Sequence, residues 1–250
     1  MEELDRLQKI LDRTRRMVFF GGAGLSTASG IPDFRSASGL FSDSHVLEGM
    51  EGFAGLTPEM ILSSSFFYLH PEQFFRFYRK CMLYPQARPN AVHRKLFALE
   101  KTDKLRGIVT QNIDGLHRKA GNIRVYELHG SVHENTCMDC GDRYDLAWMV
   151  GNTELVPRCP HCGGVVKPDV VLYGEGMDKY VCMGACREIS QADTLLVAGT
   201  SLQVEPAASF LSYFHGKDLV VINREATSAD AGASLVMHED IAEVMDALTV

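Results

Sequence analysis

The sequence predicts an α/β fold in which a doubly wound parallel sheet carries a smaller inserted domain. Three observations lead to this prediction. Short apolar runs alternate with segments of helical periodicity, which is the pattern of strands joined by crossover helices. Several of these runs are apolar at almost every position, as in strands buried on both faces of a sheet. Residues 133–167 interrupt the alternation and are the natural candidate for a separate small unit.

Five apolar runs are the predicted strands of the parallel sheet. They lie at residues 17–20, 107–110, 125–128, 194–198 and 219–222. Each run has four or five residues, a length that suits a buried strand better than a helix.

Helical segments are predicted between these strands. Apolar residues at helical spacing within residues 4–11 indicate an amphipathic helix before the first strand. Residues 57–83 are predicted to be helical, and their five phenylalanines are interpreted as core packing. Asn90 is expected to cap a further helix, and residues 240–248 are expected to close the chain as a helix.

The 250-residue chain is long enough for one large domain that carries a small one. Its net charge of −7 argues against a general nucleic-acid-binding protein. No apolar run approaches the ~20 residues that a membrane span needs, and the acidic N-terminus lacks the layout of a signal peptide. We therefore expect a cytoplasmic protein without membrane or specific nucleic-acid partners, and we expect it to be a monomer.

The first predicted strand leads into a glycine-rich turn, Gly22-Ala23-Gly24, which lets a phosphate approach the backbone closely. The turn departs from the ordinary dinucleotide fingerprint, because Thr27 stands where the third glycine is expected. An acid, an aromatic ring and a guanidinium follow at Asp33-Phe34-Arg35, which a plain phosphate loop does not need. The turn therefore predicts a nucleotide site of an unusual kind.

Two Cys-x-x-Cys pairs lie in the segment that interrupts the alternation. Cys137 and Cys140 form the first pair, Cys159 and Cys162 form the second, and eighteen residues separate the pairs. This spacing is typical of a four-cysteine zinc ribbon, and in a cytosolic protein it favours a metal over disulfides. His161 could replace one cysteine, although the doubled spacing favours four thiolates. Four thiolates close the coordination sphere, so the predicted Zn²⁺ is structural.

These features divide the chain into three predicted parts. A zinc-ribbon module spans residues 133–167, and a module with a cofactor loop and helices spans residues 36–85. A Rossmann-like nucleotide-binding domain takes residues 1–35, 86–132 and 168–250.

Polar residues follow several predicted strands, at the sheet edge where ligands of parallel sheets bind. Gln111, Asn112 and Asp114 suit a ribose or an amide, although a capped turn, taken alone, is the slightly favoured explanation. His129 could take a proton from a sugar hydroxyl near neutral pH, although a lone histidine is more often structural. Small hydroxyl residues within 199–202 suit a phosphate or a ribose.

Together these motifs resemble the sirtuin family, the NAD-dependent protein lysine deacylases. The resemblance covers nearly the whole chain, and the motifs occur in the family's order. Gly21 departs from a common Thr and Tyr173 from a common Phe, but neither touches the expected chemistry directly. The matching elements are residues 22–26 and 30–35, Gln111-Asn112-Ile113-Asp114, His129-Gly130, the four cysteines, Gly174-Glu175, Gly199-Thr200-Ser201-Leu202 and Val221-Ile222-Asn223.

The resemblance implies a deacetylase that consumes NAD as a cosubstrate and acts on acetylated proteins or peptides. Acetyl-lysine, NAD and water would give lysine, nicotinamide and O-acetyl-ADP-ribose. His129 would be the general base, and Asn112 and Ser26 would orient the ribose. Asp114 and Ile113 would hold the nicotinamide amide.

The resemblance also implies the remaining contacts with NAD and the peptide. The expected NAD contacts are Gly22, Ala23, Gly24, Thr27, Asp33, Phe34, Arg35, Gln111, Asn112, Ile113, Asp114, His129, Gly199, Thr200, Ser201, Asn223, Arg224 and Asp240. The segment from Val170 to Glu175 resembles the strand that pairs with the substrate peptide. The expected peptide contacts are Val171, Tyr173, Gly174 and Glu175.

The acyl group can be narrowed further by resemblance. Sirtuins that remove succinyl groups resemble one another in a Tyr-x-x-Arg pair that grips the distal carboxylate. The best alignment places Tyr78 at the first position and Cys81 where the arginine should stand. Because the bidentate clamp is then missing, we expect a preference for acetyl or other uncharged acyl groups.

Other functions remain open. A protein mono-ADP-ribosyltransferase, or a deacylase of longer uncharged acyl groups, would use the same site. A hydride-transferring dehydrogenase would share the sheet, but the acid expected ~20 residues beyond the glycines is not evident. A non-enzymatic zinc- and nucleotide-binding module is the remote alternative.

Overall fold

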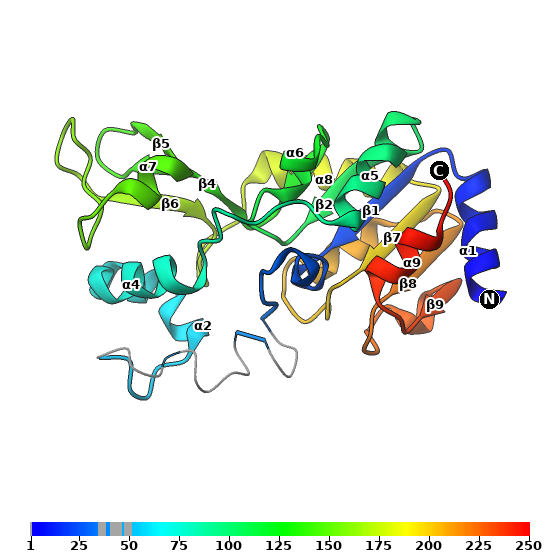
Figure 1. Cartoon of the computed structure of the whole chain (residues 1–250), viewed down its shortest axis with the longest axis horizontal. Helices are drawn as coiled ribbons and strands as arrows, with labels where there is room; N and C mark the ends of the chain where they lie inside the picture. Colours follow the sequence, from blue (N-terminus) through cyan, green and yellow to red (C-terminus); the bar gives the residue numbers. More distant parts are fainter. Residues whose placement is uncertain (1, 35–38, 41–46, 48–51) are drawn as a thin grey trace.

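The larger lobe is built on one sheet of six strands in the order β3-β2-β1-β7-β8-β9 (Figure 1). The computed structural model describes residues 2–34, 39–40, 47 and 52–250. Every strand pairing in this sheet is parallel, which confirms the predicted doubly wound α/β fold. The strands are β1 (Met17–Gly21), β2 (Leu105–Thr110), β3 (Val125–Glu127), β7 (Thr194–Ala198), β8 (Asp218–Ile222) and β9 (Leu235–Met237).

The sheet separates two hydrophobic cores, because successive side chains of a strand point to opposite faces. Met17 and Phe19 of β1 face one core, whereas Val18 and Phe20 face the other. The sheet is thus buried on both faces, as parallel sheets generally are. The first core takes in α1 (Glu2–Arg13), α5 (Ala91–Lys101) and α9 (Ile241–Ala247), and the second takes in α8 (Lys179–Gln191) and η3 (Ala208–Tyr213).

The strand order reverses between β1 and β7, which lie side by side at the middle of the sheet. The chain proceeds outward from β1 on one side and outward from β7 on the other. Such a reversal leaves a crevice at the carboxyl ends of the two central strands, where ligands of open parallel sheets bind. Because β1 ends at Gly21 and β7 at Ala198, the turns that follow them face this crevice.

The smaller lobe joins an antiparallel sheet to a group of short helices (Figure 1). The sheet has the order β5-β4-β6. Its strands begin at residue 130 and end at residue 170, so they extend three residues beyond each end of the predicted module of residues 133–167. Sheet and helices share one hydrophobic core, in which the five phenylalanines predicted as core packing are buried. The elements are β4 (Gly130–Cys137), β5 (Arg143–Asp145), β6 (Val166–Val170), α2 (Pro58–Ile61), α3 (Ser64–Leu69), α4 (Pro71–Cys81) and α7 (Leu146–Gly151).

Three short helices occupy the segment predicted as one helical stretch, residues 57–83. Ser63 separates the first two, because its side chain caps α3 by accepting a hydrogen bond from the Phe66 N–H at 3.2 Å. Pro71 begins the third, since proline suits the first turn of a helix but lacks the N–H that interior positions need. Asn90 caps α5, as predicted.

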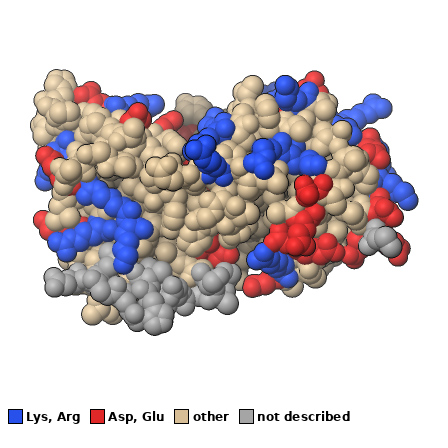
Figure 2. Space-filling model, viewed as in Figure 1, with Lys and Arg blue, Asp and Glu red and all other residues tan. Residues whose placement is uncertain are grey.

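The remaining elements are short. η1 (Ala23–Leu25) and η2 (Thr27–Ser29) follow β1, α6 (Leu116–Ala120) follows β2, and η4 (Asp230–Gly232) precedes β9. No helix in the described part of the chain is long and apolar enough to cross a membrane. Figure 2 shows Lys and Arg on both lobes and a group of acidic side chains on the larger one.

Candidate active site

A cavity of about 460 Å³ lies at the carboxyl edge of the parallel sheet. Turns after β1, β2, β7 and β8 line it from the larger lobe, and residues 170–175 line it from the other side. The predicted peptide contacts that line it are Val171, Tyr173, Gly174 and Glu175. The predicted NAD contacts that line it are Gly22, Ala23, Gly24, Thr27, Asp33, Phe34, Gln111, Asn112, Ile113, His129, Gly199, Thr200, Ser201, Asn223, Arg224 and Asp240.

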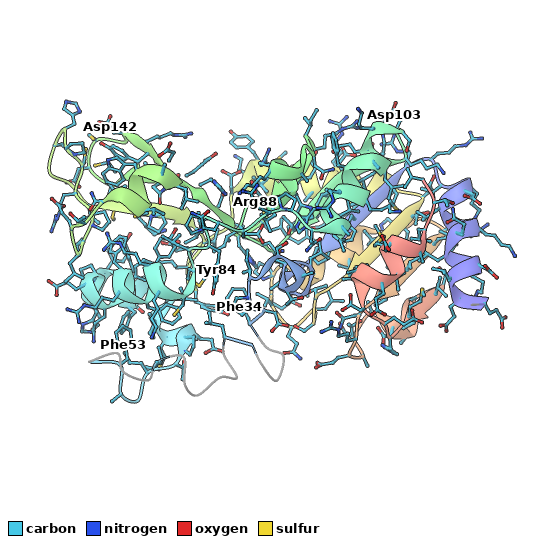
Figure 3. All side chains as sticks on the ribbon, in the orientation of Figure 1. Phe34, Phe53, Tyr84, Arg88, Asp103 and Asp142 are labelled. Atoms are coloured by element: carbon cyan, nitrogen blue, oxygen red, sulfur yellow. The ribbon has the colours of Figure 1, made fainter. Side chains whose placement is uncertain are left out.

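A second cavity of about 50 Å³ adjoins the first. Phe34 and Asn112 line both cavities, whereas Ser26 and Asp114 line only the smaller one. Tyr84 also lines the smaller cavity, and it lies near Phe34 between the two lobes (Figure 3). The predicted site is therefore divided into two compartments, a division that the sequence did not indicate.

The glycines after β1 allow two backbone turns to touch. The Gly24 N–H donates to the Gly199 carbonyl at 2.9 Å. A Cβ atom on Gly24 would lie 2.9 Å from the same carbonyl oxygen, and one on Gly22 would lie 2.9 Å from the Thr200 Cβ. Carbon atoms do not approach this closely, so both positions require glycine. The glycines thus serve the close packing of two turns, in addition to the phosphate approach that the sequence suggested.

Three polar side chains form a network at the wall between the two cavities. The Ser26 hydroxyl donates to one Asp114 carboxylate oxygen at 2.6 Å and accepts from the Asn112 amide at 3.1 Å. The other Asp114 oxygen accepts from the Leu116 N–H at 2.8 Å. Burial raises the pKa of Asp114, although the bonds from Ser26 and Leu116 oppose the shift. The network therefore fixes a buried carboxyl group against the smaller cavity.

The imidazole of His129 is oriented by the turn that follows β2. Its Nδ1 lies 3.0 Å from the Gln111 carbonyl oxygen. A carbonyl can only accept a hydrogen bond, so the neutral ring carries its hydrogen on Nδ1 and its lone pair on Nε2. The Gln111 side chain in turn donates to the Thr200 hydroxyl at 3.0 Å. The Gln111 turn therefore fixes both the orientation and the tautomer of the neutral His129 ring.

The far end of the large cavity contains an ion pair. Arg224 donates to the Asp240 carboxylate, and both residues line the cavity. Asp240 also caps α9 by accepting from the Ala242 N–H at 2.7 Å. Burial by itself would raise the pKa of Asp240, but the bonds from Arg224 and Ala242 bring it below its ordinary value. Asp240 is consequently held as a carboxylate beside the cavity.

Some residues that line this end of the cavity were not predicted from the sequence. They could have been found, because each lies in the same turn as a predicted contact or directly beside one. Arg35, a predicted NAD contact, lies outside the described residues. The additional lining residues are Gln203, Val204, Glu205, Pro206, Glu225, Glu239 and Ile241.

The segment expected to pair with a peptide differs from the prediction. Val170 belongs to β6, Tyr173 forms an isolated parallel β-bridge with Ser63, and the other residues of 171–175 are outside any strand. Gly174 has a φ of +91°, which takes the backbone out of the extended conformation. The Glu175 carboxylate accepts from the Leu172 N–H at 2.9 Å and from Lys167 Nζ at 3.1 Å. Glu175 thus closes its own turn.

The same segment ties three parts of the chain together. The Val171 N–H donates to the His129 carbonyl at 2.9 Å, beside the turn that holds the imidazole. The Tyr173 N–H donates to the Leu62 carbonyl at 3.0 Å, and the Tyr173 carbonyl accepts from the Ser64 N–H at 2.9 Å. These backbone bonds position the segment as a wall of the large cavity.

The four cysteines of the two Cys-x-x-Cys pairs meet in the smaller lobe. Their sulfur atoms all lie within 4.8 Å of one another, with 3.4 Å between Cys137 and Cys162 and 3.6 Å between Cys140 and Cys159. Tetrahedral zinc with Zn–S bonds of about 2.3 Å would separate its sulfurs by about 3.8 Å. The four thiol groups fit one Zn²⁺ ion, and none is in a disulfide.

His161 lies beside this cluster and is paired differently. Its Nδ1 lies 3.1 Å from an Asp142 carboxylate oxygen, at the exposed edge of the lobe. Ligand atoms of Cys140, Asp142 and His161 also lie within 4.8 Å of one another, but the four-cysteine group supplies the complete set of four sulfur ligands that a tetrahedral Zn²⁺ takes. None of these cysteines lines either cavity, so a zinc ion there would support the fold at a distance from the large cavity.

Comparison with known families and proteins adds an independent finding. The model of the Sir2 family matches residues 22–206. The NAD-dependent protein deacetylase of Clostridium acetobutylicum is 48% identical over 246 residues, which is 98% of this chain and 98% of the relative. The enzyme of the same name from Clostridium perfringens is 49% identical and covers 98% of this chain and 97% of the relative.

Solved structures of Sir2 proteins are also similar to this chain over nearly its whole length. A Sir2 variant in complex with a deacetylated p53 peptide and 3′-O-acetyl ADP ribose superimposes with a TM-score of 0.86 at 32% identity. The match covers 98% of this chain and 96% of that chain. A Sir2 complex with a p53 peptide and NAD⁺ has a TM-score of 0.82 at 33% identity, over 97% and 95% of the two chains.

Proposed function

Because this chain belongs to the Sir2 family, we propose that it is an NAD-dependent protein lysine deacetylase. It would convert acetyl-lysine, NAD and water into lysine, nicotinamide and O-acetyl-ADP-ribose. The observation that carries the proposal is the position of His129, whose imidazole lines a nucleotide-sized cavity bounded by both lobes. The similarity of the relatives and of the solved Sir2 complexes over nearly the whole chain supports it.

In the proposed reaction His129 is the general base. Its Nδ1–H is committed to the Gln111 carbonyl, so Nε2 takes the proton from a ribose hydroxyl as that hydroxyl attacks the acyl group. Asn112 lines the same cavity and would orient the ribose. Ser26 would act one step away, because its hydroxyl holds Asn112 and Asp114 in place.

The smaller cavity would hold the nicotinamide group. Asp114 and Ile113 would hold the amide there, and Phe34, which lines both cavities, would cover the reacting sugar carbon. This separation keeps the leaving group apart from the ribose during the attack by the acyl oxygen. It also explains why an aromatic ring follows the glycine-rich turn, which a cofactor that is merely recycled would not require.

The rest of the NAD molecule would extend along the large cavity. Ala23, Gly24 and Thr27 would meet the diphosphate, and Thr200 and Ser201 would continue the wall toward the adenosine half. Asn223, Arg224 and Asp240 would surround the adenosine. We also propose the domain boundaries predicted from the sequence. The NAD-binding domain would take residues 1–35, 86–132 and 168–250, the module with the cofactor loop and helices residues 36–85, and the zinc-ribbon module residues 133–167.

The peptide would bind against residues 171–175. Recognition would use main-chain hydrogen bonds, which give affinity with little dependence on the peptide sequence. The structural Zn²⁺ would hold the antiparallel sheet from which this segment emerges at β6. The metal would thus affect turnover only through the shape of the peptide-facing wall.

We further propose that the acyl group is uncharged. Among the described residues that line the two cavities, the only cationic ones are Arg224 and Lys119. Arg224 pairs with Asp240, and Lys119 Nζ donates to the Ala87 carbonyl at 2.7 Å. Neither is placed as a clamp for a distal carboxylate.

The best alignment places Cys81 at the arginine position of the succinyl clamp, and Cys81 lines the smaller cavity. Tyr78, its aligned partner, is fully buried in the core of the smaller lobe. We expect acetyl-lysine peptide to have a higher kcat/KM than succinyl-lysine peptide. A Cys81→Arg variant should narrow this difference, and a wild-type enzyme that favours succinyl would contradict the proposal.

Mass spectrometry of the products from NAD and an acetyl-lysine peptide tests the main proposal. We expect nicotinamide and acetylated ADP-ribose to appear together, one of each per lysine released. ADP-ribose attached to the protein or peptide would instead indicate the transferase, and net formation of NADH would indicate a dehydrogenase. Binding of NAD without any turnover would indicate a non-enzymatic module.

We also propose the cellular compartment and the oligomeric state of the protein. A thiolate cluster persists in a reducing compartment, which supports the cytoplasm as the location. The expectation of a monomer without specific nucleic-acid partners is tested by light scattering of the purified protein with and without DNA.

A further inference from the structure

The start of α5 touches the glycine-rich loop from outside both cavities. We name residues 22–30, which contain η1 and η2, the Gly-rich loop. We infer that Asn90, the capping residue of α5, is a positioning residue for this loop and hence for NAD. The inference rests on the proposed function for its connection to catalysis, but its structural part can be tested without turnover.

The side-chain amide of Asn90 is fully used. Its Oδ1 accepts from the Val92 N–H at 3.0 Å, which caps the helix. Its Nδ2 donates to the Leu25 carbonyl at 2.8 Å and to the Ser29 hydroxyl at 3.0 Å. The opposite orientation of the amide would set donor against donor and acceptor against acceptor. The amide therefore joins a helix end to two points of the Gly-rich loop.

His93 completes a capping box with Asn90: its backbone N–H donates to Asn90 Oδ1 at 3.4 Å, and its Nδ1 accepts from the Asn90 N–H at 3.3 Å. The same Nδ1 lies 2.9 Å from Asn90 Oδ1, and the ring is fully buried. The His93 ring also contacts the His117 ring in α6, with 4.8 Å between the centroids. α6 begins two residues after Asp114, which bonds Ser26 of the loop. The start of α5 thus contacts the loop that carries Ser26 and the helix that follows Asp114.

The two anchored points flank two of the loop residues that line the cavities. Ser26 and Thr27 lie between Leu25 and Ser29, and Ser26 is almost completely buried. The loop consists of 3₁₀ turns, whose hydrogen bonds have poorer geometry than those of an α-helix. Such a loop depends on external anchors for a single conformation. Without the two bonds from Nδ2, the bonds at Gly24 and Ser26 would remain, and binding of NAD would have to order the part of the loop that follows Ser26.

An Asn90→Ser variant separates the two tasks of this residue. Serine is about as good a helix cap as asparagine, but its side chain is too short to reach the Gly-rich loop. We expect α5 to stay capped and thermal stability to fall only by the loss of the two hydrogen bonds to the loop. We expect amide hydrogen exchange within residues 22–30 to accelerate, and NAD affinity to fall about fivefold for each lost hydrogen bond. KM for NAD should rise with little change in KM for the peptide.

Asp178→Ser is the matched control, because it exchanges one capping residue for another at α8. Asp178 accepts from the Tyr180 and Val181 N–H groups and lies far from the loop in sequence. This variant should leave loop exchange and NAD affinity unchanged. Ser29→Ala provides a second variant that leaves α5 intact, and it should move both quantities in the same direction by a smaller factor.

The combination of Asn90→Ser with Ser29→Ala gives a double-mutant cycle. The two effects should not add, because both variants remove the same hydrogen bond. Unchanged loop exchange and unchanged NAD affinity in both single variants would overturn the inference. So would an equal response in Asp178→Ser. A wild-type protein that released no nicotinamide would refute the proposed function, while loop exchange in the absence of NAD would still decide the role of Asn90.

Discussion

The two lobes are stabilised in different ways. The larger lobe buries a parallel sheet between two hydrophobic cores, each built from that lobe's own helices. The smaller lobe has one core, shared by helices from residues 58–81 and strands from residues 130–170, next to four clustered thiols. The proposed proton acceptor and nucleotide contacts belong to the larger lobe. The proposed catalytic residues thus lie apart from the proposed metal site. The stability of the smaller lobe is expected to depend on the metal.

The chain carries an internal probe for this difference. Its single tryptophan, Trp148, lies in α7 of the smaller lobe, with 4.2 Å between its ring centroid and that of Tyr144. Tryptophan fluorescence therefore reports on the smaller lobe alone, whereas circular dichroism reports mainly on the helices of both. The predictions that follow use this separation, in order of decreasing expected effect.

Removal of the metal should have the largest effect. Structural zinc sites contribute on the order of 10 kcal/mol to folding, so a chelator should unfold much of the smaller lobe. We expect the Trp148 emission to shift toward that of an exposed tryptophan, while much of the far-ultraviolet circular dichroism persists. Cys137→Ser should behave alike, and Cys186→Ser in α8 should not.

The control for this experiment is the measured zinc content. Complete loss of zinc with an unchanged Trp148 emission would contradict a structural role for the metal. Restoration of emission and deacetylation by added zinc would support it.

Loss of the imidazole at residue 129 should have the next largest effect, now confined to the larger lobe. Positioned general bases contribute about 10²–10⁴-fold to rates, so His129→Ala should lose that much kcat. Circular dichroism and Trp148 emission should stay unchanged. His215→Ala, at an exposed site, is the matched control. Substantial deacetylation by purified His129→Ala would refute its assignment.

Acid should destabilise the larger lobe through its buried histidines. Burial lowers the pKa of His93 from 6.5 to about 4, and burial also lowers the pKa of His117. The unfolded chain therefore binds protons that the folded one excludes. The stability from His93 is complete above pH 6.5 and is lost as the pH falls toward 4, by about 2 kcal/mol between pH 7 and pH 5.

Urea unfolding followed by circular dichroism at pH 7, 6 and 5 measures this slope. A His93→Gln variant should have lower stability at pH 7 but a flatter pH dependence. An unchanged slope in this variant would show that other groups cause the acid sensitivity.

The smallest effect is expected at Asp240, which both caps α9 and pairs with Arg224. Asp240→Ala should cost about 1 kcal/mol of unfolding free energy through the lost cap. Asp240→Asn keeps a capping oxygen and should cost less. Both variants should weaken NAD binding modestly, as titration calorimetry can measure, and equal stability of both variants would argue against the cap.

Much of the larger lobe could be predicted from its sequence, because its strands, buried on both faces, are apolar at almost every position. β9 was missed because it has only three residues, with its middle side chain half-buried. The strands of the smaller lobe were missed for a different reason. β4 contains Gly, Ser, His, Glu and Asn, so no apolar alternation marks it as a strand.

The candidate site could be predicted in part for a comparable reason. Ligands of a parallel sheet bind at the carboxyl ends of its strands, so polar residues after apolar runs pointed to the cavity. The sequence could not show that Ser26 and Asp114 belong to a separate compartment, because that depends on one hydrogen bond across 88 residues. The Asn90 contacts with the Gly-rich loop depend on the same kind of long-range packing.

The hydrogen bond from the Val171 N–H to the His129 carbonyl has a mechanical consequence. The chain leaves the larger lobe just after His129, and this bond holds that crossing beside the segment that follows β6. Helices α2 to α4 are joined to the larger lobe by separate crossings, so the term hinge refers to the His129–Val171 bond alone. A rigid rotation displaces each atom in proportion to its distance from the axis. Closure of the smaller lobe about this hinge would move the zinc cluster far and the imidazole hardly at all. The base could keep its alignment while the lobes open for product release.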